Sequence, residues 1–309
     1  MKNDSTIANL FQRIIKKDMY LSLSSVIEKI DFHYAIIKGD VLSLQAYGKL
    51  GERSYGDIDI LIPRDKIKIF EKILEENGFY PFDKTRENRV MMLSCSHQVF
   101  PWYKKIGLLS NIIIDINFDL FWGEYNNKRI CMDSFLSDTI NINVYGINFK
   151  TLPPMKALIQ LILHHYKDMN SIFLLATRNS IKFEMFKDIF FLLKNNIESI
   201  PLDSFHSICI NLKIDAYVFY VLYYTGKIFD DVVLKQYIET FRTSYGESLL
   251  DVYGLKDEEK KIWHCDFETR LNSNNIFELI KNDLNHNDME RIETNKKLFS
   301  RFKDEKNKQ

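Results

Sequence analysis

The chain has 309 residues, of which 46% are hydrophobic, and its 42 Lys and Arg balance its 42 Asp and Glu. A chain of this length can bury one large core or two modest ones. Zero net charge provides no long-range field that would gather a polyanion, so nucleic acid is possible but not favoured as a partner.

The cysteine pattern and the hydropathy pattern predict a cytoplasmic protein with no membrane partner. The four cysteines are far apart and lack the CxxC spacing of zinc and redox sites, which favours a reducing compartment. No stretch has the length of a signal peptide's apolar region, and none approaches the roughly 18 unbroken apolar residues of a membrane span.

The first predicted elements are helical and lead into a strand. Apolar residues recur at helical spacing between Thr6 and Ile30, with a polar break at Lys17–Asp18, and predict one or two amphipathic helices. The run HYAIIKG then reads as a short strand, and VLSLQAYGKLG reads as a helix with a glycine stop. The turn between that strand and that helix falls at Lys38–Gly39.

The segment DIDILI predicts a half-buried strand, because its carboxylates, Asp57 and Asp59, alternate with isoleucines and share one face. A helix over residues 67–74 follows, closed by Asn77–Gly78. Two weaker strands are predicted around Val90–Ser94 and Gln98–Tyr103.

A second strongly β-branched run, NIIIDINFDLFW, carries Asp115, Asn117 and Asp119 on one face. INVYGINF predicts a hairpin, and Pro153–Pro154 is the strongest boundary signal. We therefore predict a catalytic domain over residues 1–150 and a mostly α-helical domain over residues 151–309, ending in a frayed tail.

Clustered carboxylates on neighbouring strands are typical of nucleotidyl transfer, in which divalent ions do most of the chemistry. Mg²⁺, or Mn²⁺ in its place, prefers oxygen ligands. Asp57 and Asp59 are the predicted metal ligands and catalytic residues, and Asp115 is the predicted third carboxylate, with Asp119 as the reserve.

The Lys38–Gly39 turn is the predicted phosphate-binding element, because it ends a strand where a helix begins and leaves backbone N–H groups for phosphate oxygens. Asp40, next to it, is expected to cap the following helix. Arg53 suits either an ion pair with Asp57 or contact with phosphate.

The ordered motifs IIKG, RSYGDIDILI and IIIDINF resemble those of the nucleotidyltransferase superfamily. The chain is most similar to the bacterial family of uncharacterised nucleotidyltransferases, over roughly residues 30–195, through His97, LPPMKALIQLILHH and KDIFFLL as well. The resemblance implies an α+β fold with a small mixed sheet flanked by helices. It also implies metal at Asp57, Asp59 and Asp115, and triphosphate at Lys38, Gly39 and Arg53. In this chain Asp40 and Asn117 replace a serine and a histidine that the family pattern would have.

Three side chains of the helical half have two interpretations each. His164 and His165 lie on a predicted helix beside apolar residues, where a histidine is usually an interior or interface group rather than a ligand. Asp188 is either a site residue or a structural hydrogen-bond partner. The aromatic run AYVFYVLYYTG predicts core packing.

The predicted activity is transfer of a nucleoside monophosphate from a triphosphate, with ATP expected, to a hydroxyl on a small molecule, peptide or protein. One alternative is a toxin-like nucleotidyltransferase acting on tRNA. The other is a non-catalytic nucleotide-binding relative, prompted by Asp40 and Asn117. The acceptor, the base preference and the oligomeric state are left open.

Overall fold

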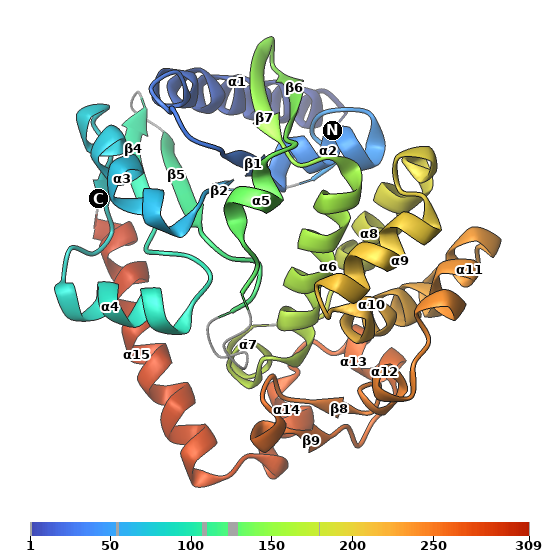
Figure 1. Cartoon of the computed structure of the whole chain (residues 1–309). Coiled ribbons are helices and arrows are strands. Elements are labelled where there is room, and N and C mark those ends of the chain that lie inside the picture. The colour runs from blue at the N-terminus through green and yellow to red at the C-terminus, as the bar shows by residue number, and fades with distance from the viewer. Residues whose placement is uncertain (1, 54–55, 107–109, 123–128, 179, 309) are drawn as a thin grey trace. The chain divides into compact units, whose positions relative to one another are not determined.

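The computed structural model describes residues 2–53, 56–106, 110–122, 129–178 and 180–308 (Figure 1). They form two compact units. The sheet unit comprises the described residues up to 122 and from 129 to 157, and the helical unit comprises those from 158 onward. The predicted α+β class is confirmed. The assignment of catalysis to the first half and of a structural or acceptor role to the second stays a prediction.

Seven strands among the described residues form a mixed sheet in the order β3-β4-β5-β2-β1-β7-β6. β2 runs parallel to β5 and β1 runs parallel to β7, whereas the other neighbouring pairs are antiparallel. The strands are β1 (Ala35–Ile37), β2 (Ile58–Leu61), β3 (Tyr80–Pro81), β4 (Trp102–Ile106), β5 (Ser110–Asn117), β6 (Ile140–Val144) and β7 (Ile147–Thr151).

Helices α1 and α3 cover one face of this sheet. Ile60 and Ile114 point to that face and pack in one core with Leu23 of α1 and with Phe70 and Leu74 of α3; all five side chains are fully buried. Because side chains alternate along a strand, the residues next to these isoleucines point to the opposite face. The helices of this unit are α1 (Lys2–Ile27), α2 (Gly39–Tyr47), α3 (Ile67–Glu76), α4 (Arg86–Cys95) and α5 (Met132–Leu136).

Two turns predicted from glycines are confirmed. α2 ends at Gly48, whose φ of 70° is the left-handed conformation typical of a helix C-cap. β6 and β7 form a hairpin that turns at Tyr145 and Gly146, with φ angles of 54° and 89°.

The strand predicted around Val90–Ser94 is wrong, because this segment lies in α4. Asp83 accepts hydrogen bonds from the N–H and hydroxyl of Thr85, which forms a tight turn immediately before the helix. The segment contains one β-branched residue, Val90, which is 58% exposed, and its Met and Leu residues favour helix.

Of the one or two helices predicted near the N-terminus, the structure has one: α1 is continuous, and Lys17–Asp18 is exposed on its solvent side. The tail predicted to be frayed is helical, because α15 continues to Lys308.

The helical unit has an aromatic interior. The buried ring of Tyr166 packs against the buried rings of Tyr217 and Tyr220, with centroid distances of 4.4 Å and 5.1 Å respectively. These contacts confirm the packing role of the aromatic run. None of the described helices is long and apolar enough to cross a membrane. The helices and strands of the helical unit are α6 (Pro154–Asn170), α7 (Ile172–Thr177), α8 (Phe183–Asn195), α9 (Leu202–Asn211), α10 (Asp215–Ile228), α11 (Val232–Phe241), α12 (Ser244–Ser248), β8 (Val252–Tyr253), β9 (Lys261–Ile262), α13 (Phe267–Asn272), α14 (Phe277–Ile280) and α15 (His286–Lys308).

Candidate active site

Two of the predicted carboxylates lie directly opposite each other on neighbouring strands. Asp59 of β2 and Asp115 of β5 are register partners in a parallel pair. Both therefore point to the face opposite α1 and α3, from backbones that lie about 4.8 Å apart. This spacing allows two carboxylates to share one cation.

Asp57 lies just outside this pair. β2 begins at Ile58, so Asp57 is in the loop that enters the strand, and its side chain is half-buried. All four residues of β2 are buried, which corrects the expectation of a half-buried strand. The Asp57 carboxylate is thus more accessible to solvent than the Asp59 carboxylate, since Asp59 is only 8% exposed.

Asp59 accepts two hydrogen bonds through the same oxygen. Lys38 Nζ lies 2.9 Å from Asp59 Oδ1, and Asn117 Nδ2 lies 3.1 Å from it. The sequence placed Asn117 on the same strand face as Asp115 and noted it as a departure from a family pattern, but assigned it no role. The structure shows that it donates a hydrogen bond to Asp59.

The Lys38–Gly39 turn has a backbone conformation rare for a residue with a side chain. Lys38 has φ 58° and ψ −149°, and Gly39 has φ 49°. Non-glycine residues in this region cost about 1–3 kcal/mol each. The turn directs the Lys38 ammonium onto Asp59 and leads into α2. The backbone N–H groups of a helix's first turn are of the kind that bind phosphate.

Asp40 does not cap α2. The helix has Lys38 at its N-cap with no side-chain cap hydrogen bond, and Asp40, one residue inside, is fully buried. Asp40 Oδ1 accepts a hydrogen bond from the N–H of Gly51 at 3.3 Å and lies 3.8 Å from Lys16 Nζ. The carboxylate therefore ties α2 to α1 and to the loop that follows α2.

That loop, residues 48–53, is held at several points. Ser43 of α2 donates to the carbonyl of Lys49 and accepts from the N–H of Glu52, and Lys16 Nζ donates to the carbonyl of Arg53 at 3.3 Å. Burial lowers the pKa of Lys16, and the negative charge of Asp40 opposes that shift. The backbone at Arg53 is thus positioned, whereas the two roles predicted for its side chain stay predictions.

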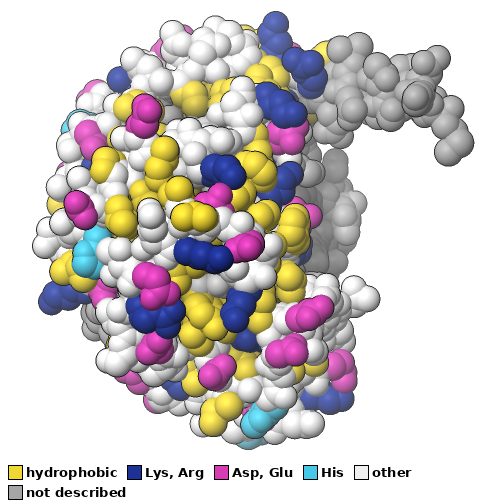
Figure 2. Space-filling view, turned by 90° about the vertical axis from the view of Figure 1, so that its right-hand side faces the viewer, with side chains coloured by type: hydrophobic (Ala, Val, Ile, Leu, Met, Phe, Trp, Pro, Cys, Tyr) yellow, Lys and Arg dark blue, Asp and Glu magenta, His cyan; other side chains and the backbone are white. Residues whose placement is uncertain are grey.

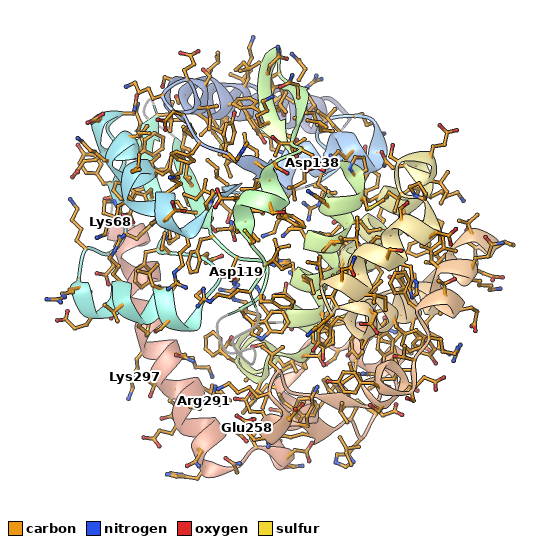
Figure 3. All side chains as sticks on the ribbon, in the orientation of Figure 1. Lys68, Asp119, Asp138, Glu258, Arg291 and Lys297 are labelled. Carbon is orange, nitrogen blue, oxygen red and sulfur yellow. The ribbon has the colours of Figure 1, made fainter. Side chains whose placement is uncertain are left out.

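Asp119, the reserve third carboxylate, lies beyond the end of β5 (Figure 3). Its Oδ1 accepts hydrogen bonds from the N–H groups of Leu120 and Phe121, and Arg129 lies 3.6 Å from its Oδ2. Burial raises its pKa, although these N–H groups and Arg129 oppose the shift. Asp119 thus shapes the turn after the strand, whereas Asp115 lies opposite Asp59.

A cavity of about 350 Å³ lies elsewhere in the sheet unit, near α3 and α4. Its floor includes Trp102, which pairs with Ile114 and so points to the face opposite Asp115. Charges of both signs surround it, among them Lys68 (Figure 3). None of the predicted site residues lines this cavity.

In the helical unit, His165 and Asp188 are buried and His164 is partly exposed. His164 pairs with Asp168, a residue that the sequence did not single out, although it lies one helical turn further along α6. Together His164, His165 and Asp168 have the donor atoms to hold a metal ion.

Carboxylates on two paired strands, together with a strand and a helix joined by the Lys38–Gly39 turn, are typical of the nucleotidyltransferase class. The chain belongs to the family of uncharacterised nucleotidyltransferases, whose family model matches residues 5–230. This match confirms the predicted resemblance and supports nucleotidyl transfer as the general activity. No curated protein matches the chain closely enough to indicate a substrate.

Proposed function

We propose that this protein transfers a nucleoside monophosphate from a nucleoside triphosphate, with ATP expected, to a hydroxyl of a small molecule, peptide or protein. The observation that carries the proposal is the register pairing of Asp59 with Asp115, next to the Lys38–Gly39 turn. In the reaction the acceptor oxygen bonds to the α-phosphorus, the bond from that phosphorus to the bridging oxygen breaks, and pyrophosphate leaves.

The donor set fits a hard divalent cation. Asp57, Asp59 and Asp115 offer only oxygen atoms, the ligands that Mg²⁺ and Mn²⁺ prefer. When bound, such an ion neutralises charge on the phosphates and aligns the acceptor oxygen. Asp59 already attracts a cation in this structure, since the Lys38 ammonium lies 2.9 Å away.

The remaining steps fall to the chain's own groups. The backbone N–H groups at the start of α2 and the Lys38 ammonium bind triphosphate oxygens, with Arg53 as a further phosphate ligand. One aspartate accepts the proton of the acceptor hydroxyl. Asp115 is our choice, because Lys38 and Asn117 both donate to Asp59.

The balance of charge, 42 Lys and Arg against 42 Asp and Glu, favours an acceptor other than tRNA. On the one face that Figure 2 presents, Lys and Arg side chains are interspersed with Asp and Glu. Binding to nucleic acid draws on broad basic areas. Cys131, Cys209 and Cys265 are free thiols, in keeping with the cytoplasmic location that we propose.

Binding of α,β-methylene-ATP with and without Mg²⁺, followed by transfer of label from each α-labelled triphosphate, tests the proposal. We expect Mg²⁺-dependent binding and transfer that Asp59→Asn abolishes and Asp138→Asn preserves. Asp138 is a suitable control because it is a carboxylate of the same unit, 56% exposed, that pairs with Lys156 (Figure 3). Equal activity in the two variants, or no Mg²⁺-dependent binding of any triphosphate, would exclude the proposed site.

A further inference from the structure

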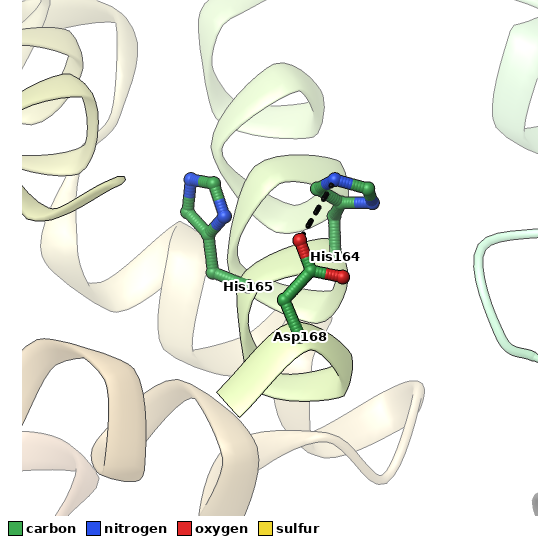
Figure 4. A group of neighbouring side chains, drawn as sticks. All are labelled: His164, His165 and Asp168. Atoms are coloured by element: carbon green, nitrogen blue, oxygen red, sulfur yellow. Dashed lines mark ion pairs between the residues drawn. The ribbon is translucent and has the colours of Figure 1, made fainter. Parts of the chain in front are cut away.

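One turn of α6 brings two imidazoles and a carboxylate together (Figure 4). Asp168 is four residues after His164 and three after His165, so its side chain lies over both histidines. One potential ligand atom from each of the three residues lies within 4.8 Å of the other two. Figure 4 shows the Asp168 carboxylate beside the His164 ring, to which the dashed ion pair of 3.3 Å joins it.

The spacing of the rings suits one shared ion. Their centroids are 5.6 Å apart, with an angle of 55° between the ring planes. Two imidazoles on one tetrahedral zinc, with Zn–N bonds of about 2.1 Å, place their centroids about 5 Å apart. Side-chain rotations that bring the ligand atoms, which lie within 4.8 Å of one another, closer together would place both rings and the carboxylate on a single ion.

The cluster already attracts a positive charge. Lys167 Nζ lies 3.3 Å from Asp168 Oδ1 and 3.4 Å from His164 Nδ1. The side chains of His164 and Asp168 are each 23% exposed, whereas His165 is buried. A cation can thus approach from solvent and meet partly desolvated ligands, in competition with the lysine.

We propose that His164, His165 and Asp168 form a second metal site, for a zinc-class divalent ion, with water completing the coordination. Imidazole nitrogens suit Zn²⁺ and Co²⁺, whereas Mg²⁺ prefers oxygens. The site therefore differs in metal preference from the carboxylates of the sheet unit. It does not depend on nucleotidyl transfer.

Titration of untagged full-length protein with Co²⁺, in excess Mg²⁺ that occupies the carboxylates, tests this site. Four-coordinate cobalt has visible absorption bands that report its ligands, and Zn²⁺ should displace it. We expect one equivalent to bind. Loss of a residue that only orients a metal ligand weakens metal binding by roughly 10- to 100-fold. His164→Gln and Asp168→Asn each remove a ligand, so they should weaken Co²⁺ binding by more than that.

His264→Gln is the matched control, because His264 also pairs with an aspartate, Asp283, at 3.3 Å but belongs to no group of three potential metal ligands among the described residues. It should leave Co²⁺ affinity unchanged, and Lys167→Met should raise it by removing the competing ammonium. Circular dichroism verifies that each variant is folded. Equal affinity in His164→Gln and His264→Gln, or absence of four-coordinate bands from the wild type, would overturn the site.

Discussion

The carboxylates of β2 and β5 and the histidine cluster of α6 are two groups of metal-type ligands built in different ways. Asp59 and Asp115 come from separate strands and meet only because β2 and β5 pair in register. The cluster of α6 lies within one helical turn. In each group a lysine ammonium contacts a carboxylate, Lys38 in the first and Lys167 in the second.

The difference shows what each group requires from the fold. A site assembled from strands, a turn and a loop depends on distant packing, whereas a site on one helix depends mainly on that helix. Oxygen ligands suit Mg²⁺ in the first case and nitrogen ligands suit zinc-class ions in the second. Substitutions in each region test this contrast.

The largest expected effect tests whether the strand carboxylates act together. Asp115→Asn should lower the rate of nucleotidyl transfer by about 10³-fold, because metal stabilisation of a transition state contributes several kcal/mol. Asp119→Asn should retain most of the activity, since Asp119 mainly accepts hydrogen bonds from the turn after β5. Label-transfer rates measure both. A larger loss in Asp119→Asn than in Asp115→Asn would reverse the assignment.

The next effect tests how far the sheet site depends on distant packing. Lys16→Met leaves the fully buried Asp40 without its cationic neighbour and should lower the free energy of unfolding by about 3 kcal/mol. Lys16→Met with Asp40→Asn should recover much of that loss. Urea denaturation measures the three variants. Lys17→Met, on the exposed side of α1, is the control, and an equal loss there would remove the special role of Lys16.

Lys38→Met tests the competition between a lysine and a cation at the strand carboxylates. Without triphosphate, Mg²⁺ should bind more tightly, because the ammonium 2.9 Å from Asp59 is gone. The KM for triphosphate should rise by roughly 10- to 100-fold, the value of one hydrogen bond to a charged group. Calorimetry and steady-state kinetics separate the two effects. Lys150→Met, at an exposed position, should change neither.

The smallest expected effect is the loss of stability when one helix cap in the helical unit is removed. Asp231 caps α11 by accepting from the N–H groups of Val233 and Leu234, so Asp231→Ala should cost about 1 kcal/mol. The N–H of Leu234, and then Lys194, lower the pKa of Asp231. Its contribution is therefore present above the ordinary pKa of 3.8 and is lost as the pH falls through the lowered value.

Thermal denaturation of Asp231→Ala at neutral pH and near pH 3 measures this dependence. The difference from wild type should shrink at the lower pH. Asp230→Ala is the matched control, because Asp230 is 87% exposed and adjacent. A cost that is the same at both pH values would contradict a cap that depends on charge.

Sequence patterns predicted the parts of the fold that local chemistry determines. The isoleucine-rich strands, the Gly48 helix stop and the Tyr145–Gly146 turn all follow from residue type and spacing. The strand expected at Val90–Ser94 failed because one β-branched residue cannot outweigh helix-forming neighbours that follow a turn at Asp83.

The contacts between distant segments could not be predicted from the sequence. The ion pair between Lys16 and Asp40 joins α1 to α2, and no local sequence pattern predicts it. The same is true of the register that sets Asp59 opposite Asp115, although the likeness of their two strands suggested that they share a face. Asp168, by contrast, was within reach of a search for ligands one helical turn from His164.

The backbone at Lys38 has a consequence for engineering. With φ 58° and ψ −149°, this position would suit glycine better than lysine. In Lys38→Gly two effects on stability oppose each other: the backbone strain of about 1–3 kcal/mol is relieved, but the buried Asp59 loses the ammonium 2.9 Å away. The strained backbone and the ion pair that it positions therefore have to be changed together in any attempt to stabilise this turn.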